Sequence, residues 1–187
     1  MVNVKGQVGL RILRGLGADE RRRLEAQYIE LWTQHGASLG RLASSYEAQD
    51  QACEDLLQEI RLAIWTALPR FRGESSVRTF AFRIAHNRAL AHVWKRKRSA
   101  VSEDLEGIEI LDPGNGPDAI AAENFEQQRL FAAIRTLPLP MKQVITLALE
   151  EISYREIGEI LGLSENNVAV RLNRAKAQLR QKLGGTQ

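Results

Sequence analysis

The stretch Ser153–Lys176 reads S-Y-R-E-I-G-E-I-L-G-L-S-E-N-N-V-A-V-R-L-N-R-A-K, and its spacing predicts a helix-turn-helix. Ser153 and Glu156 have the spacing of a capping box, in which the two residues satisfy each other's backbone N–H groups at the start of a helix. Gly162 can adopt the left-handed conformation that ends this short helix, and Ser164 can cap the longer basic helix that follows. A short helix, a turn containing glycine and a second helix together make up the motif.

The longer helix has one apolar face and one polar face. Val168 recurs with Leu172, Ala175 and Leu179 on a single side, which we expect to be buried. The other side is rich in Asn and Arg, which pair with adenine and guanine in the major groove of duplex DNA. The residues expected to contact the DNA are Ser164, Asn166, Asn167, Val170, Arg171, Asn173 and Arg174.

Upstream of the motif, Phe71–Arg98 is strongly basic, with the single acid Glu74. On a helix, Phe80 falls on one apolar side, whereas Phe82 and Trp94 fall elsewhere. Aromatic rings that are not needed for packing can stack on single-stranded bases, while Arg and Lys follow the phosphates. A solvated basic helix with an apolar core is the alternative.

Two further helices are expected before this basic stretch. A helix that Asp19 can cap has apolar residues at helical spacing, and Gly36 and Gly40 are expected to interrupt or bend it. Gln51–Leu68 has one continuous apolar stripe, and Pro69 is expected to end that helix. A charged outer face is more often solvated than functional. On this helix the outer face includes Asp55, Gln58, Glu59 and Arg61.

The domain organisation is predicted from a change in composition. Residues 99–126 contain no Lys or Arg, and D-P-G-N-G-P within them is dense in turn-forming residues. We therefore predict an all-α protein with two small helical domains, the second containing the helix-turn-helix. The predicted parts are a loosely ordered extension (1–17), a first domain (18–98), a flexible acidic linker (99–117) and a second domain (118–187).

Composition narrows the class of protein further. The chain has 187 residues, a net charge of +3 and one cysteine, Cys53, which cannot form an internal disulfide. No apolar run approaches the roughly 20 residues of a membrane span, so we expect a cytoplasmic protein. His35, His86 and His92 lack metal-ligand spacing, and no phosphate-binding loop or activated nucleophile is evident. We expect no metal, no cofactor and no enzymatic activity.

From Tyr28 to Leu183 the chain resembles bacterial sigma factors of the extracytoplasmic-function (ECF) group. The resemblance rests on three segments. They are E-D-L-L-Q-E-I-R-L-A-I-W-T-A-L-P-R-F-R-G-E-S-S-V-R-T-F-A-F-R-I-A-H-N-R-A-L at Glu54–Leu90, K-R-K-R at Lys95–Arg98, and the stretch from L-P-L-P-M-K-Q-V at Leu137–Val144 through Ser153–Lys176. It implies a protein of two helical domains that directs core RNA polymerase to promoters. It also implies that the linker threads through the polymerase, and that an anti-sigma protein is a possible further partner.

The resemblance assigns roles by position. Asp55, Gln58, Glu59 and Arg61 correspond to residues that dock on the polymerase clamp, and the helix-turn-helix corresponds to the part that reads the upstream, minus-35 box. Asn87 corresponds to a residue that reads an extruded base of the melted downstream box. The residues implied for that downstream box are Phe71, Arg72, Phe80, Phe82, Arg83, Asn87, Arg88, Trp94, Lys95 and Arg96.

The sequence departs from the family pattern at several of these positions. Phe80 and Phe82 replace the Trp and Tyr of R-T-W-L-Y-R. Ala169 and Val170 stand where the family often has a basic residue and Ser, which shifts base reading onto Asn166, Asn173 and Arg174. The alternative to a sigma factor is a free-standing helix-turn-helix regulator, which would bind its DNA without polymerase and most often as a dimer.

Overall fold

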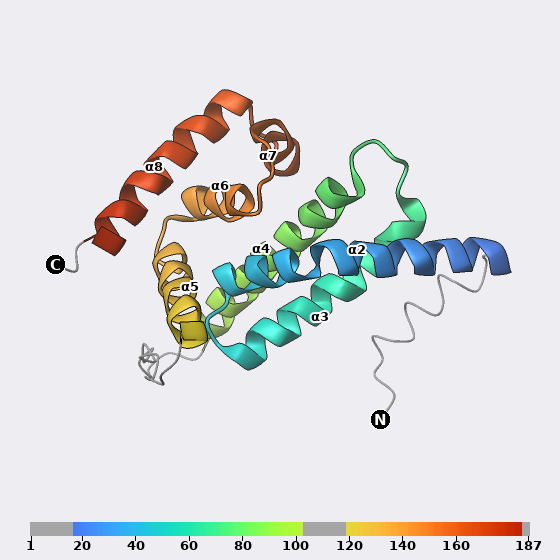
Figure 1. Cartoon of the computed structure of the whole chain (residues 1–187), viewed down its shortest axis with the longest axis horizontal. Helices are drawn as coiled ribbons and strands as arrows, with labels where there is room; N and C mark the ends of the chain where they lie inside the picture. The colour runs from blue at the N-terminus through green and yellow to red at the C-terminus, as the bar shows by residue number, and fades with distance from the viewer. Residues whose placement is uncertain (1–16, 103–118, 185–187) are drawn as a thin grey trace.

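The computed structural model describes residues 17–102 and 119–184. Every regular element within these ranges is helical, which confirms the predicted all-α class (Figure 1). The elements are α2 (Ala18–Tyr46), α3 (Asp50–Ala67), the 3-10 turn η1 (Leu68–Arg70), α4 (Val77–Ser102), α5 (Ala119–Arg135), α6 (Leu139–Leu149), α7 (Tyr154–Leu161) and α8 (Glu165–Gly184). We call α2–α4 the N-terminal group and α5–α8 the C-terminal group.

The start of α2 and the end of α4 differ from those predicted from the sequence. α2 has Gly17 at its cap position, so Asp19 lies in the first turn and does not cap the helix. α4 continues to Ser102, beyond the predicted domain end at residue 98. The remainder of the predicted linker and most of the N-terminal extension lie outside the described residues.

α2 is one helix, so Gly36 and Gly40 do not interrupt it. Leu39 and Leu42 are completely buried on either side of Gly40. Burial of a leucine side chain is worth about 1.5 to 3 kcal/mol, which outweighs the penalty of about 1 kcal/mol for a glycine in a helix. Gly36 also faces Trp32, where an added Cβ would lie 3.2 Å from the indole ring.

α3 follows its predicted pattern. Leu56, Ile60 and Ile64 are completely buried, and the helix gives way to η1, which contains Pro69. The next connection brings the chain to α4, which packs against both α2 and α3.

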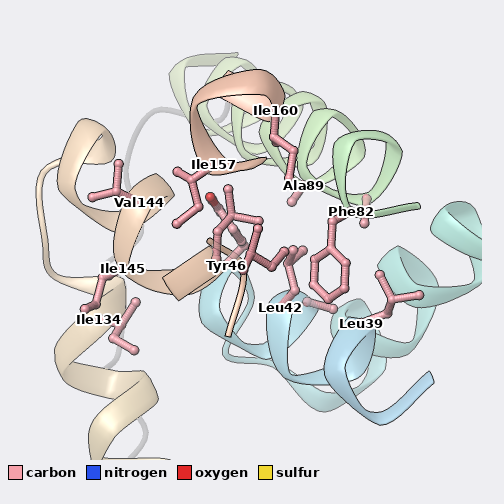
Figure 2. Close-up of a cluster of buried hydrophobic side chains, with 14 of the residues drawn as sticks. Leu39, Leu42, Tyr46, Phe82, Ala89, Ile134, Val144, Ile145, Ile157 and Ile160 are labelled. Carbon is pink, nitrogen blue, oxygen red and sulfur yellow. The ribbon is translucent and has the colours of Figure 1, made fainter. Parts of the chain in front are cut away.

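The buried side of α4 overlaps only in part with the one expected. Its core residues include Ala81, Phe82 and Ala89, all with 0% exposure, whereas Phe80, which the sequence places on the apolar side, is half-buried. Figure 2 shows the Phe82 ring beside Leu39 and Leu42 of α2. The helix is apolar around most of its circumference, and packing against α2, α3 and α7 together selects the buried side.

The helix-turn-helix is confirmed at the level of individual hydrogen bonds. At the start of α7 the Ser153 hydroxyl accepts from the Glu156 N–H, and the Glu156 carboxylate accepts from the Ser153 N–H. Gly162 ends α7 with a φ of 68°, in the left-handed region. The backbone N–H of Asn167 then donates to the Ser164 hydroxyl over 3.3 Å at the start of α8.

The two groups of helices pack on each other through an apolar interface. α7 packs on α4, and α5 and α6 pack on α2, whereas α8 rests on α5, α6 and α7 (Figure 1). One cluster of buried apolar side chains extends through both groups. Ile160 of α7 lies next to Ala89 of α4, and Ile157 faces Tyr46 (Figure 2).

Polar contacts surround this apolar interface. The Arg41 guanidinium donates to both carboxylate oxygens of Glu150, over 2.9 and 2.6 Å, and Arg78 donates to the Glu150 backbone carbonyl. The Thr79 hydroxyl donates to the Glu156 carboxylate over 2.8 Å, so the capping box of α7 is itself tied to α4.

Candidate nucleic-acid and polymerase interfaces

The outer face of α8 presents the side chains predicted to reach duplex DNA. Val168, Leu172, Ala175 and Leu179 are buried, so the opposite side of the helix faces outward. Of the predicted contacts, Ser164, Asn166, Asn167, Val170, Asn173 and Arg174 are exposed, and Arg171 is half-buried at the flank. Because α8 lies on the outside of the C-terminal group, a duplex can approach this face without displacing another helix (Figure 1).

The outer face of α3 carries the predicted polymerase-docking residues. Asp55, Gln58 and Arg61 are exposed, and Glu59 is half-buried. The Arg61 guanidinium lies 4.8 Å from the centre of the Trp32 ring. The backbone carbonyl of Arg61 accepts a 3.3 Å hydrogen bond from the Tyr28 hydroxyl. Arg61 is therefore held at the edge of a shallow aromatic groove between α2 and α3, which Tyr28, Ile29, Trp32 and Thr33 complete.

The basic stretch divides into exposed and packed residues. Arg72, Asn87, Arg88 and Lys95 are exposed. Phe71, in the connection before α4, and Phe80 are half-buried, and their ring centres lie 4.8 Å apart, so each ring covers part of the other. Trp94 is 53% exposed near the Lys97 ammonium.

Phe82 corrects the sequence prediction. The sequence predicts that this ring is available to single-stranded bases, but it is completely buried in the core, beside Leu39 and Leu42 of α2 (Figure 2). Stacking a base on it would require removing it from the core, at roughly the 3 to 5 kcal/mol that deletion of a buried phenylalanine costs. We remove Phe82 from the candidate site.

Arg83 and Arg96 are only partly available to phosphates. Arg83 is half-buried, and its Nε has no hydrogen-bond partner among the described residues. The Arg96 guanidinium contacts both carboxylate oxygens of Glu47, over 2.5 and 2.6 Å. The basic run is thus attached to the end of α2.

Glu47 is a buried carboxylate in the connection between α2 and α3. Its residue exposure is 2%, and it also accepts hydrogen bonds from the Gln49 N–H and from His92 Nε2, the latter over 2.9 Å. Burial alone would raise the pKa of Glu47, but the hydrogen bonds from Arg96, Gln49 and His92 outweigh it and lower the pKa to about 2. Only its acidity and its position after a helix could have drawn attention to it.

His86 is the second buried polar group that sequence reasoning missed. It is 2% exposed between Tyr46 of α2 and Gln143 of α6, with its Nδ1 3.3 Å from the Tyr46 hydroxyl and its Nε2 3.2 Å from the Gln143 amide nitrogen. Burial lowers the pKa of His86 to about 4. The sequence indicated only that it lies on α4.

The described residues contain no metal cluster and no membrane helix. Within 17–102 and 119–184, no three His, Cys, Asp or Glu side chains are grouped as metal ligands. In that part of the chain, none of the helices has the length and apolar character needed to cross a membrane.

Comparison with known proteins identifies the family. Residues 31–99 match the family model for Sigma-70 region 2, and residues 127–179 match the one for Sigma-70, region 4. The ECF RNA polymerase sigma-E factor of Escherichia coli K12 is 30% identical over 138 residues, which cover 69% of this chain and 72% of that protein. The chain belongs to the ECF sigma factors. This confirms that it functions in promoter-directed initiation of transcription, with core RNA polymerase and promoter DNA as partners, and the free-standing regulator is not favoured.

Other relatives of this ECF sigma factor support the same fold. The RNA polymerase sigma factor CnrH of Cupriavidus metallidurans is 28% identical over 177 residues, covering 90% of this chain and 91% of that protein. The structure of CnrH in complex with the cytosolic domain of CnrY matches with a TM-score of 0.64 at 22% identity, over 99% of this chain and 100% of that one. The structure of RpoE with the anti-sigma factor NepR from Bartonella quintana matches with a TM-score of 0.66 at 20% identity, over 86% and 99%.

Proposed function

We propose that this ECF sigma factor holds duplex DNA with α8, holds the melted strand with the basic stretch around α4, and docks on the polymerase clamp with the outer face of α3. The observation that carries the proposal is that most of the side chains that the family pattern assigns to these tasks are exposed, on α3, on α8 and along the basic stretch. The proposed functional units are residues 18–98 and 118–187, joined by the acidic segment 99–117.

The upstream box is assigned to α8. Its outward Asn and Arg side chains can form paired hydrogen bonds with adenine and guanine, each good pair being worth about 1 to 3 kcal/mol of discrimination. Ser164 and Arg171, at the edge of this face, are better placed for phosphates. Arg174 is the residue on which we expect guanine recognition to depend most.

The downstream box is assigned to the basic stretch without Phe82. The exposed cations would follow the phosphates of the opened strand, and Asn87, which is exposed next to Arg88 on α4, would read an extruded base. The residues that remain in this proposal are Phe71, Arg72, Phe80, Arg83, Asn87, Arg88, Trp94, Lys95 and Arg96. Counterion release at these phosphates would make promoter affinity fall steeply with salt.

The protein would act without catalytic activity of its own, in the cytoplasm, and under the control of an anti-sigma factor. Support for this last partner comes from two structural neighbours, CnrH and RpoE, which were solved with CnrY and with the anti-sigma factor NepR. We expect the docking of such a protein to compete with that of the polymerase.

Transcription in vitro tests the proposal as a whole. The purified chain is added to bacterial core RNA polymerase on a library of genomic fragments, and the transcript starts are mapped. Specific starts that need both components, together with weak binding of promoter DNA by the chain alone in a gel shift, are the expected result. Strong palindrome-specific binding without polymerase, or no starts at all, would contradict it.

The docking assignment is tested by the double substitution Asp55→Ala and Gln58→Ala. Both side chains are exposed on α3, so their removal should leave the fold intact and lower the affinity for core polymerase by about tenfold or more, as expected for interface residues worth above 1 kcal/mol. Gln51→Ala, at an exposed position one turn earlier on the same helix, is the matched control. Equal affinities of the double variant and the control in a pull-down titration would refute the assignment.

A further inference from the structure

Val170 is an apolar side chain at the centre of a polar face. It is 42% exposed, whereas the preceding and following positions of the apolar repeat, Val168 and Leu172, are buried on the opposite side of α8. Its neighbours three and four residues away on the helix surface are polar or charged. They are Asn166, Asn167, Asn173 and Arg174, and all of them are exposed.

The fold does not explain this valine. Among the described residues it joins no buried cluster, and it has no apolar partner one turn away on α8. A β-branched residue is also less favourable than alanine at an exposed helix position, by about half a kcal/mol. Single exposed apolar residues are common on protein surfaces, but this one occupies the apex of the face proposed to enter the major groove.

The chemistry of the major groove limits what an isopropyl group can recognise there. Adenine, guanine and cytosine present hydrogen-bond donors and acceptors at their edges, and the apolar group in the groove is the C5-methyl of thymine. Valine can neither donate nor accept a hydrogen bond. If it covered a polar base edge, it would leave that edge unpaired and desolvated, which is unfavourable.

We infer that Val170 selects a thymine in the upstream box by packing against its C5-methyl group, while Asn166, Asn173 and Arg174 hydrogen-bond to the neighbouring base pairs. The inference rests on the proposed role of α8 and adds to it the identity of one base. Val170 would favour thymine in two ways. It buries the thymine methyl group, and it disfavours other bases because their polar edges would be left without hydrogen bonds.

The test removes the methyl group alone. The holoenzyme, formed from the full chain and bacterial core polymerase, first selects upstream boxes from a randomised promoter library. Each thymine of the selected box, on either strand, is then replaced in turn by deoxyuridine, and promoter affinity is measured by equilibrium competition. At one thymine we expect the replacement to lower affinity about fourfold, the value for burying one methyl group.

Variants at position 170 link that effect to the valine. Val170→Ala should fold at least as well, because alanine favours helices. Its shorter side chain lies farther from the methyl group, so the difference in affinity between thymine and deoxyuridine promoters should become clearly smaller. Val170→Ile keeps an apolar tip and should retain the preference. A deoxyuridine effect of the same size in Val170→Ala, or no sensitive thymine in the wild-type box, would overturn the inference.

Arg174→Ala separates this inference from the proposed role of α8. If Arg174→Ala alters which upstream boxes are selected while deoxyuridine has no effect, only the assignment of Val170 fails. If neither Arg174→Ala nor Val170→Ala alters the selected boxes, α8 does not read the upstream DNA, and the proposed role fails as well.

Discussion

At the scale of single residues, His86 is the most informative side chain because it joins α2, α4 and α6. The Gln143 amide nitrogen can only donate, so Nε2 of His86 accepts that hydrogen bond, and the proton of the neutral ring lies on Nδ1, where it can be donated to Tyr46. Protonation of Nε2 would place two donors against each other in a buried site. This is consistent with the lowered pKa of about 4.

We predict that His86 makes the protein sensitive to acid in a defined pH window. Its pKa falls from 6.5 when unfolded to about 4 when folded, so the unfolded state binds the proton more readily between these values. The contribution of the neutral His86 to the free energy of unfolding is therefore complete above about pH 6.5 and is lost as the pH falls toward 4. The total loss in unfolding free energy is of the order of 3 kcal/mol. Urea unfolding at a series of pH values measures it.

His86→Gln is the variant for this measurement. It keeps a polar side chain but cannot titrate, so its unfolding free energy should change less across the same pH range. Glu47 titrates mostly below this window, because its pKa is lowered from 4.5 to about 2. Its contribution to the free energy of unfolding is lost as the pH falls from about 4.5 to about 2. A wild-type slope that persists in His86→Gln would assign the acid sensitivity to another group.

At the scale of single elements, the close approach of α7 and α8 depends on Gly158. An added Cβ would lie 2.6 Å from the carbonyl oxygen of Leu163, in the turn that leads to α8. The same turn is held by a 2.9 Å hydrogen bond from the Leu163 N–H to the Gly158 carbonyl. Both contacts involve backbone atoms of Leu163. These atoms cannot move away from an added Cβ as the end of a flexible side chain would.

Gly158→Ala should therefore destabilise the protein, by roughly 1 to 3 kcal/mol from overpacking, although alanine normally favours helices over glycine by about 1 kcal/mol. Gly40→Ala in α2 is the matched control, since an added Cβ there meets no described atom within 4 Å beyond its chain neighbours and the nearby backbone of its own helix. We expect thermal unfolding to show a lower Tm for Gly158→Ala and an unchanged or higher Tm for Gly40→Ala. A stabilised Gly158→Ala would mean that the turn tolerates displacement.

At the scale of the whole molecule, the two groups of helices are held together by burial and by a ring of hydrogen bonds. Glu150 has a central place in that ring, because its carboxylate binds Arg41 and its backbone carbonyl binds Arg78, while the residue is only 5% exposed. The Arg135 guanidinium adds a 2.8 Å hydrogen bond to the Ser44 carbonyl of α2.

Arg41→Ala should loosen the contact between the groups, because it leaves the buried Glu150 carboxylate without its guanidinium partner. The Arg41 side chain is 40% exposed, so we expect a loss of about 1 to 2 kcal/mol, below the range for fully buried pairs. Small-angle X-ray scattering should show a larger radius of gyration. Arg155→Ala removes an exposed ion pair within α7 and serves as the control. Equal scattering of the two variants would show that the apolar interface alone keeps the groups together.

Local signals in the sequence determined the helix-turn-helix, the end of α3 and the outward side of α8. Each depends on residues a few positions apart, such as the reciprocal hydrogen bonds of Ser153 and Glu156 or the left-handed Gly162. Such features are decided by backbone geometry within one or two turns, and a distant part of the chain changes them little. The roles of the residues on these surfaces came from family resemblance and stay predictions.

Tertiary structure alone decided which side of α4 is buried, where Glu47 finds its partners, and how the two groups of helices meet. α4 is apolar around most of its circumference, so its own sequence allows several packing faces, and contact with α2, α3 and α7 selects the one that buries Phe82. Glu47 and Arg96 lie 49 positions apart, and Arg41 and Glu150 lie 109 apart. No local periodicity encodes such pairs, because their distance in space is set by the packing of helices that the intervening chain merely connects.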